Sequence, residues 1–342
     1  MLFSNFSMAS LMNTRRETEE QLNDEANAVT KKLKKITSMH ITCKRVLKRN
    51  ETRVIILCCD WAPDNRHVVS SSQDGQLNIW NTVTSRIKQT FTLPTDWLMS
   101  CAYSPSGNLV ACGGMNNKLN VFNISVPTAD SLPVEKETIG IHRHFISCCL
   151  FPNTDHRILT GSGDTTVALW DVESKTLLQS FSEHTRDIMS IDVLPSDRNI
   201  FVSGGCKNTM VLWDMRMEQS AQTFKGYATD INSVKFHPSG VTVASGCTDA
   251  TCWLYDLRTN KKVAIYANED LWFGCSSIDF STSGRILLSG YTDRKIIAWD
   301  SLDYEKIKTF RGHKNKVSHL KRSPDGAALA TASWDGSLRI WA

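Results

Sequence analysis

The feature that most constrains this chain of 342 residues is an internal repeat. Seven segments share one pattern, in which a turn is followed by a short strand-like run that ends on an aromatic residue. The closing aromatics, 42, 48, 43, 42, 44 and 42 residues apart, are Trp80, Phe122, Trp170, Trp213, Tyr255, Trp299 and Trp341. A period of this length indicates that one supersecondary unit recurs and buries its apolar face against its neighbours.

Two polar positions recur with the aromatics. Asp stands six residues before the aromatic in five of seven repeats, the exceptions being Asn116 and Lys207. Ser or Thr stands four residues earlier still in six of seven, with Cys112 as the exception. A buried Asp needs hydrogen-bond partners, and three histidines are placed to join it and the Trp indole: His142, His184 and His313. Catalytic triads are the alternative interpretation, which is disfavoured because a triad is needed only once.

Repeats of this period with aromatic–Asp endings are typical of WD40 blades, each a four-stranded sheet. The predicted fold is therefore all-β, a seven-bladed WD40 β-propeller with an N-terminal coiled-coil helix. The predicted domains are residues 1–38, a tail and helix, and residues 39–342, the propeller. The last repeat lacks a fourth strand, and residues 40–49 are predicted to supply it and close the ring.

The segment before the propeller has the pattern of a helix. Residues 14–36 contain no Gly or Pro and are rich in Glu, Lys, Arg, Asn and Leu. Apolar residues at spacings of 4, 3, 4 and 3 form a coiled-coil seam: Leu22, Ala26, Val29, Leu33 and Ile36. Two to three heptads are too short to be stable alone, so the helix is expected to need a partner helix. The alternative is a helix packed on its own domain.

Composition and motifs exclude several functions. The net charge is +4 and no apolar run reaches 18 residues, so neither a nucleic-acid partner nor a membrane span is predicted. The basic run 31–35 suits acidic lipid or nucleic acid, but more often forms the charged end of a helix. The eleven cysteines form no C-x-x-C pair, and H-E-x-x-H, G-x-S-x-G and G-x-x-x-x-G-K-[ST] are absent. The chain is therefore predicted not to be an enzyme and to use no cofactor or metal.

Several longer stretches resemble the β subunits of heterotrimeric G proteins. They cover nearly the whole chain beyond the first dozen residues and include 71–75, 97–107, 110–114, 162–171, 229–234 and 249–252. Within that family the chain resembles the divergent type-five class. The stretches that carry this second resemblance are 170–174, 177–181, 201–206, 213–216 and 263–266.

The resemblance implies a signalling role and particular partners. It implies a non-catalytic subunit that pairs through the seam with a Gγ subunit or with the Gγ-like domain of an RGS protein. Such a subunit modulates Gα signalling downstream of a receptor, and the GTP chemistry belongs to its partners. The implied location is cytoplasmic, peripheral at the inner face of the plasma membrane through the partner.

The resemblance also implies that Gα binds the face bearing the entries to first strands and the turns between second and third strands. Counting back six residues from the ends of equivalent first strands, and then two forward, selects residues on one side of each strand. Together with two residues that precede turns, the predicted partner-binding set is Ile55, Leu57, Trp97, Met99, Met115, Phe145, Asp187, Met189, Asp230, Asn232 and Trp334. Any one of the apolar members could instead belong to the propeller core.

Departures from the family pattern qualify this expectation. Ile55 and Leu57 stand where a β subunit usually offers Lys and Tyr, Thr248 stands where an acidic contact is common, and Phe145 lacks a Tyr hydroxyl. Altered Gα binding is therefore expected. The competing hypothesis is a general WD40 protein-interaction scaffold in another complex, which uses the same face for peptides.

Overall fold

The computed structural model describes residues 36, 38–49, 54–95, 97–125, 136–267 and 273–342. The chain divides into two units, Met1–Met39 and His40–Ala342, and the description below concerns the second. No helix occurs among the described residues, and hence none that could cross a membrane. The predicted N-terminal helix lies outside the described residues, except for Ile36.

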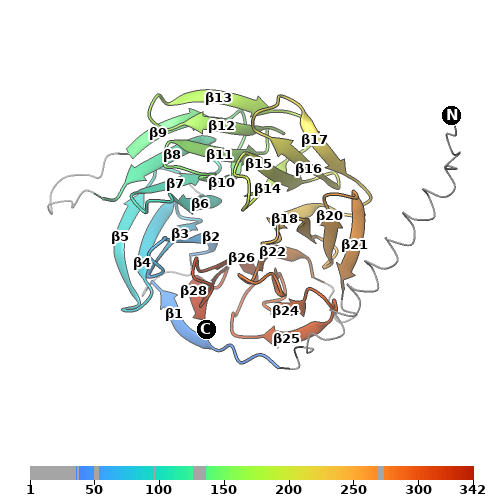
Figure 1. The fold of residues 1–342 in the computed structure, drawn as a ribbon. Coiled ribbons are helices and arrows are strands. Elements are labelled where there is room, and N and C mark those ends of the chain that lie inside the picture. The colour runs from blue at the N-terminus through green and yellow to red at the C-terminus, as the bar shows by residue number, and fades with distance from the viewer. Residues whose placement is uncertain (1–35, 37, 50–53, 96, 126–135, 268–272) are drawn as a thin grey trace, which may run out of the picture. The chain divides into compact units, whose positions relative to one another are not determined.

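The second unit is a ring of seven four-stranded antiparallel sheets (Figure 1). Blade 1 comprises β2 (Ile56–Trp61), β3 (His67–Ser72), β4 (Gln76–Asn81) and β5 (Arg86–Thr92). Blade 2 comprises β6 (Ser100–Tyr103), β7 (Leu109–Gly113), β8 (Lys118–Asn123) and β9 (Lys136–Ile141). Blade 3 comprises β10 (Ile146–Leu150), β11 (Arg157–Ser162), β12 (Val167–Asp171) and β13 (Thr176–Phe181). Blade 4 comprises β14 (Ile188–Val193), β15 (Ile200–Gly205), β16 (Thr209–Asp214) and β17 (Ser220–Phe224).

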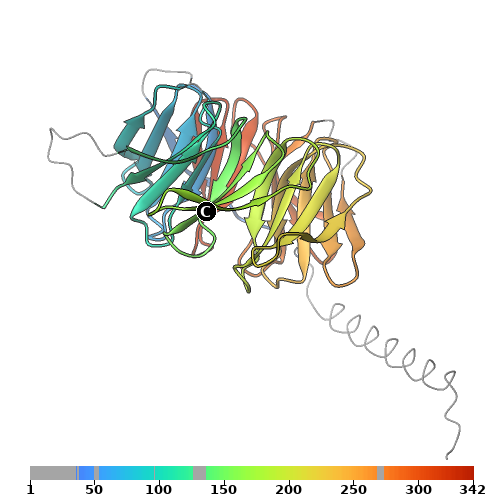
Figure 2. The same cartoon turned by 90° about the horizontal axis from the view of Figure 1, so that it is seen from above.

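The remaining three blades repeat this order. Blade 5 comprises β18 (Ile231–Phe236), β19 (Thr242–Cys247), β20 (Cys252–Asp256) and β21 (Lys261–Tyr266). Blade 6 comprises β22 (Cys275–Phe280), β23 (Ile286–Tyr291), β24 (Ile296–Asp300) and β25 (Lys306–Phe310). Blade 7 comprises β26 (Val317–Arg322), β27 (Leu329–Ser333), β28 (Ser337–Trp341) and β1 (Cys43–Lys48). Seen edge-on, the strands cross the thickness of the propeller (Figure 2). The seven-bladed WD40 propeller is thereby confirmed.

The ring closes between distant parts of the chain. β1 pairs antiparallel with β28, with Cys43 opposite Trp341 and Lys48 opposite Ser337. Beyond the strands, Thr42 and Ala342 exchange two backbone hydrogen bonds, of 3.0 and 3.1 Å between nitrogen and oxygen. Blade 7 therefore has a paired outer strand, and the sheet edge that β28 would otherwise expose is covered.

The recurring polar residues form the predicted networks. In blade 3, Thr160 Oγ1 accepts from Trp170 Nε1 at 2.8 Å and lies 2.7 Å from His142 Nε2, whose Nδ1 is 2.8 Å from Asp164. In blade 7 the corresponding group is His313, Thr331, Asp335 and Trp341. Burial would raise the pKa of Asp164, but hydrogen bonds from Thr166, the Arg143 amide and His142 outweigh it and lower the pKa to about 2. Each network joins the loop that enters a blade to the second and third strands of that blade, and it recurs, so the structural interpretation is confirmed.

Blade 4 lacks the carboxylate of this network. Lys207 occupies the Asp position with a left-handed φ of 64°, so the turn has a different backbone conformation. His184 keeps its contact to Ser203 Oγ at 2.7 Å and has Thr209 Oγ1 at 3.4 Å, and the Lys207 position offers it no carboxylate corresponding to Asp164. Burial lowers the pKa of His184 to about 4.

Replacing His184 by Gln is expected to remove part of the acid sensitivity of folding. Between pH 6.5 and pH 4 the unfolded chain takes up a proton on this imidazole while the folded chain does not. The free energy of unfolding therefore decreases as the pH is lowered through this range. The lost stability approaches about 3 kcal/mol below pH 4. Urea unfolding of both proteins at pH 7 and at pH 4.5 measures the difference. Parallel pH curves for His184→Gln and the unaltered chain would contradict the prediction.

Candidate functional site

One end of the ring is defined by seven equivalent hydrogen bonds. In each blade, a residue just before the first strand accepts a hydrogen bond through its carbonyl oxygen. The donor is the backbone amide of a residue in the turn between the second and third strands. The seven pairs, with nitrogen–oxygen distances of 2.8–3.2 Å, are Ile55–Gln73, Trp97–Met115, Phe145–Gly163, Asp187–Cys206, Asp230–Thr248, Gly274–Thr292 and Lys316–Trp334. We call these fourteen residues the rim. Seven predicted site residues belong to it: Ile55, Trp97, Met115, Phe145, Asp187, Asp230 and Trp334.

The other four predicted residues lie just inside the rim. Leu57, Met189 and Asn232 each occupy a register shift where the inner strand bulges against its neighbour. Met99 holds the corresponding position directly before β6. A bulge adds an unpaired residue and re-aims its side chain. Leu57, Met99, Met189 and Asn232 all line the central cavity, whose volume is about 680 Å³.

Of the eleven predicted residues, six line that cavity: Leu57, Trp97, Met99, Met189, Asn232 and Trp334. Ile55, Met115, Phe145, Asp187 and Asp230 lie outside its lining, although all five belong to the rim. The structure therefore places the predicted set on one end of the ring, in an inner and an outer group.

Two tryptophans and a lysine form the most distinctive part of the rim. The rings of Trp97 and Trp334 meet edge to face at 6.2 Å between centroids. Lys316 Nζ lies 3.5 Å from the centroid of the Trp334 ring, a cation–π contact, and burial lowers the pKa of this lysine. Trp97 has a φ of 57°, a conformation that a bulky residue rarely adopts. Such strain is commonly held at functional sites.

Glycine is required where the rim backbone is tightest. A Cβ on Gly114 would lie 2.2 Å from the Trp97 carbonyl oxygen, and one on Gly205 would lie 2.1 Å from that of Asp187. Either substitution would displace the strand entry that carries a rim residue. Met115, which follows Gly114, remains 54% exposed.

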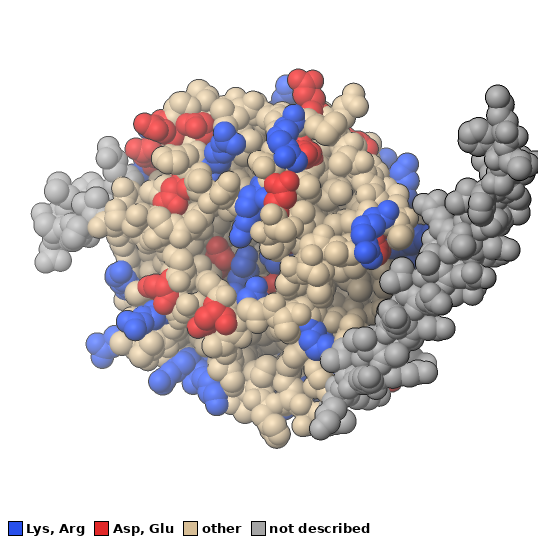
Figure 3. All heavy atoms as spheres, viewed as in Figure 1, with Lys and Arg blue, Asp and Glu red and all other residues tan. Residues whose placement is uncertain are grey.

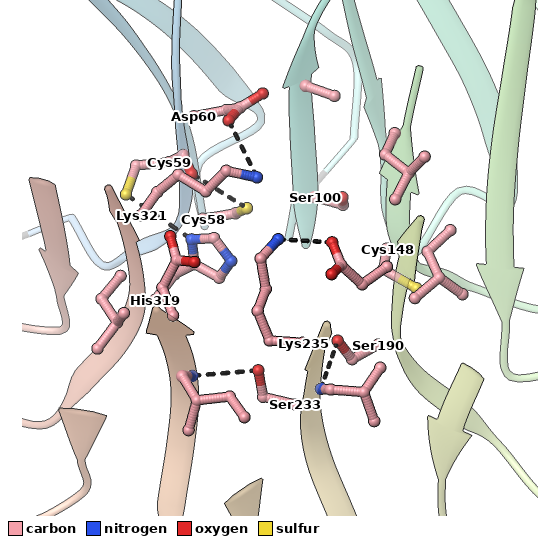
Figure 4. A pocket seen from close by; sticks show the side chains of 18 of the residues that line it. Cys58, Cys59, Asp60, Ser100, Cys148, Ser190, Ser233, Lys235, His319 and Lys321 are labelled. Carbon is pink, nitrogen blue, oxygen red and sulfur yellow. Dashed lines mark hydrogen bonds and ion pairs between the residues drawn. The ribbon is translucent and has the colours of Figure 1, made fainter. Parts of the chain in front are cut away.

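The cavity wall carries charged side chains of both signs, and blue and red atoms are visible in the central hollow (Figure 3). Lys235 Nζ donates to Asp192 at 2.5 Å, and Lys321 Nζ lies 3.5 Å from Asp60 (Figure 4). The charge of Asp60 raises the pKa of Lys321 although burial opposes it. Three aspartates of the wall also accept a backbone amide from the following blade, which ties blade 1 to 2, blade 4 to 5 and blade 6 to 7. The acceptors are Asp60, Asp192 and Asp279, and the donors are the amides of Tyr103, Phe236 and Arg322. The charged residues of the cavity wall therefore help to hold neighbouring blades together.

Sequence reasoning missed half of the rim and one cluster. The rim residues outside the predicted set are Gln73, Gly163, Cys206, Thr248, Gly274, Thr292 and Lys316. The same count would have found Lys316, because it lies six residues before Arg322, where the first strand of blade 7 ends. It was not applied there, because the first strands used for counting are followed to an aromatic or apolar residue, and Arg322 is neither. The missed cluster is Cys58, Cys59 and His319 in the cavity wall. Its cysteine pair recurs in blade 3 as Cys148 and Cys149, but the histidine comes from β26 of blade 7, which no count along a single repeat would have selected.

The predicted coiled-coil seam is not described by the structure. Leu22, Ala26, Val29 and Leu33 lie outside the described residues, and Ile36 is described alone as irregular, half-buried chain. The seam stays a prediction.

The chemistry of the rim is that of a binding surface. Tryptophan and methionine offer large contact areas, and methionine can adapt to different partners. Among the described residues, no three His, Cys, Asp or Glu side chains are grouped so as to hold a metal ion.

Comparison with known proteins agrees with this architecture. Residues 8–342 match the family of G protein beta WD-40 repeat proteins. The chain is 47% identical over 319 residues to guanine nucleotide-binding protein subunit beta-5b of Danio rerio, covering 93% of this chain and 80% of that protein. It is 42% identical over 328 residues to subunit beta-2 of Caenorhabditis elegans, covering 95% and 88% of the two chains. A subunit beta of Arabidopsis thaliana is 40% identical over 319 residues, covering 88% and 84%. The predicted resemblance is confirmed, and the chain belongs to the G protein β subunit family of WD40 repeat proteins.

Proposed function

We propose that this chain is a non-catalytic β-type signalling subunit that dimerises with a Gγ subunit or with the Gγ-like domain of an RGS protein. The proposal rests on family membership and on the apolar seam at Leu22, Ala26, Val29, Leu33 and Ile36. The likeness to a beta-5b subunit agrees with the resemblance to the type-five class, and that resemblance is what implies an RGS partner. Any position at the inner face of the plasma membrane would come from that partner.

The rim is the proposed contact surface for Gα. The observation that carries this part is the clustering of Trp97, Trp334 and exposed Met115 on one end of the ring. Aromatic anchors near the centre of a patch commonly dominate binding energy. Ile55 and Leu57 offer neither charge nor hydroxyl on the blade 1 side, so the surface should select differently from one that carries Lys and Tyr there.

Co-expression with each partner class tests the dimer. The chain is produced with a conventional Gγ, with an RGS Gγ-like domain, or alone, and each product is run on a size-exclusion column. A stable one-to-one complex with the RGS domain alone supports the type-five assignment. A complex with conventional Gγ alone assigns the ordinary β class. Soluble monomer under all three conditions would contradict the proposal and favour a general scaffold. Replacing Leu22 and Val29 by Glu should abolish either complex.

A further inference from the structure

The outer strands of blades 7 and 1 carry basic side chains and no acidic ones. β1 in blade 7 contributes Lys44, Arg45 and Lys48, and β5 in blade 1 contributes Arg86 and Lys88. All five residues are exposed. By contrast, β13 and β17, the outer strands of blades 3 and 4, contain no charged residue. We call the five basic residues the basic flank.

The two strands of the basic flank are neighbours on the edge of the ring. Arg49, directly after β1, donates to the side chain of Gln76 at the start of β4, and Gln76 pairs with Thr92 in β5. In Figure 3, Lys and Arg atoms gather along the edge of the ring where Figure 1 labels β1 and β5. The five cations therefore belong to one continuous surface.

The charges of the basic flank are not neutralised by other side chains. Within the part of the chain that the structure describes, none of the five residues forms an ion pair. Arg49 differs, because its guanidinium lies 3.0 Å from Asp74. The basic outer strands of blades 5 and 6 differ too, since Lys262 and Lys308 each lie over an aromatic ring, 4.3 and 5.7 Å from its centroid. Unpaired cations held close together repel one another, and an anionic surface relieves that repulsion.

Each strand of the basic flank also exposes an apolar side chain. Val46 in β1 is 47% exposed and Ile87 in β5 is 36% exposed, and each has basic residues before and after it in its strand. This combination suits the interface of a lipid bilayer. Cations there meet the charged headgroups, and apolar side chains reach the boundary with the acyl chains.

We propose that the basic flank binds the surface of a bilayer that contains anionic lipids. Other anionic partners fit the flank less well. Single-stranded nucleic acid is held by exposed aromatic rings on which its bases stack, and the one aromatic residue of these strands, Phe91, is 5% exposed. A peptide needs pockets for its side chains, and the hollow beside Arg49 has a volume of only about 10 Å³, enough for one water molecule.

This contact adds to the proposed function, because it determines which side of the propeller faces the membrane. A cluster of basic residues gives only weak binding by itself, whereas such a cluster combined with a lipid anchor gives stable attachment. An anchor on the partner would therefore hold the dimer at the membrane, and the basic flank would turn blades 7 and 1 towards the lipid.

Vesicle co-sedimentation tests this proposal. The full chain, alone and as a dimer with an unlipidated partner, is mixed with vesicles of phosphatidylcholine, with or without about one third phosphatidylserine. Binding is expected only to the vesicles that contain phosphatidylserine, and it should weaken as salt is added, because salt screens the charges. Since the chain is also tested alone, a failure to form the dimer and a failure to bind lipid give different results.

Matched charge variants locate the contact. Lys44→Gln combined with Lys88→Gln should weaken vesicle binding about thirtyfold, because each basic residue near an anionic surface contributes about fivefold. Lys225→Gln combined with Lys261→Gln removes the same charge from exposed positions at blades 4 and 5 and should leave binding within about twofold. All four positions are exposed, so the variants should fold normally.

Three results would overturn the proposal. They are equal binding to both kinds of vesicle, equal losses in the two double variants, and tighter binding of polyglutamate or of an RNA oligomer than of the vesicles that contain phosphatidylserine.

Discussion

Under the proposed function, replacing Trp97 and Trp334 together by Ala is expected to weaken binding to Gα by at least about a hundredfold. Buried aromatic anchors at an interface commonly contribute 2 kcal/mol or more each, and about 2.7 kcal/mol corresponds to that factor. The substitution also removes the surface over which Lys316 lies, so this cation loses its aromatic contact. Titration of the purified dimer with Gα in a calorimeter or on a biosensor gives the ratio of dissociation constants.

A pair of methionines supplies the control for this experiment. Met115 and Met217 are both 54% exposed, but only Met115 belongs to the rim. Met115→Ala should weaken Gα binding several-fold, whereas Met217→Ala should leave it unchanged. Equal effects of the two substitutions, or unaltered binding by the double tryptophan variant, would place the contact surface elsewhere on the propeller.

Replacing Trp213 by Ala should cost about 3–5 kcal/mol of unfolding free energy, the range for deleting a buried aromatic. Trp213 is 1% exposed and stacks on Phe201 at 6.0 Å between centroids. Its indole nitrogen donates to Ser203 Oγ at 2.8 Å, and that hydroxyl also contacts His184. The substitution therefore leaves a cavity and removes one partner from a buried network. Urea unfolding followed by circular dichroism measures the loss.

Trp253 offers a comparison in the next blade. It is half-buried, its ring lies 4.3 Å from Lys262 Nζ, and its indole donates only to Thr251. Trp253→Ala should cost about 1 kcal/mol, because water can fill the space left by a half-buried ring and no closed cavity remains. A similar loss in both variants would show that the cost of removing a propeller tryptophan does not depend on how deeply the ring is buried.

The fold could be predicted from the sequence because each blade solves the same hydrogen-bonding problem. A buried Trp indole, a Ser or Thr hydroxyl and a turn Asp must meet, and Thr160 and Trp170 therefore recur as Thr331 and Trp341 at the same spacing. Where one partner changes, as at Lys207, the remaining positions still reveal the repeat. The position of residues 43–48 followed from the missing strand of blade 7.

The rim was accessible to counting because equivalent strands have equivalent lengths, and Trp97 and Asp187 therefore occupy equivalent places. Counting could not predict which members of the set line the cavity and which lie outside it. That division depends on bulges such as the one at Leu57, which shift the alternation of side chains locally. The contact between Cys59 and His319 joins residues 260 positions apart, and only the closed ring brings them together.

Ring closure has a consequence for the biosynthesis of this protein. About 290 residues separate Lys48 from its partner Ser337. At about 5–20 residues per second on the ribosome, β1 would be made some 15 to 60 s before β28 exists. During that interval β1 lacks its native neighbour, and an unpaired strand is a template for wrong pairing with other chains. The nascent chain therefore has a period of vulnerability whose length is set by translation speed, and slow translation should reduce the yield of closed rings unless another molecule shelters β1.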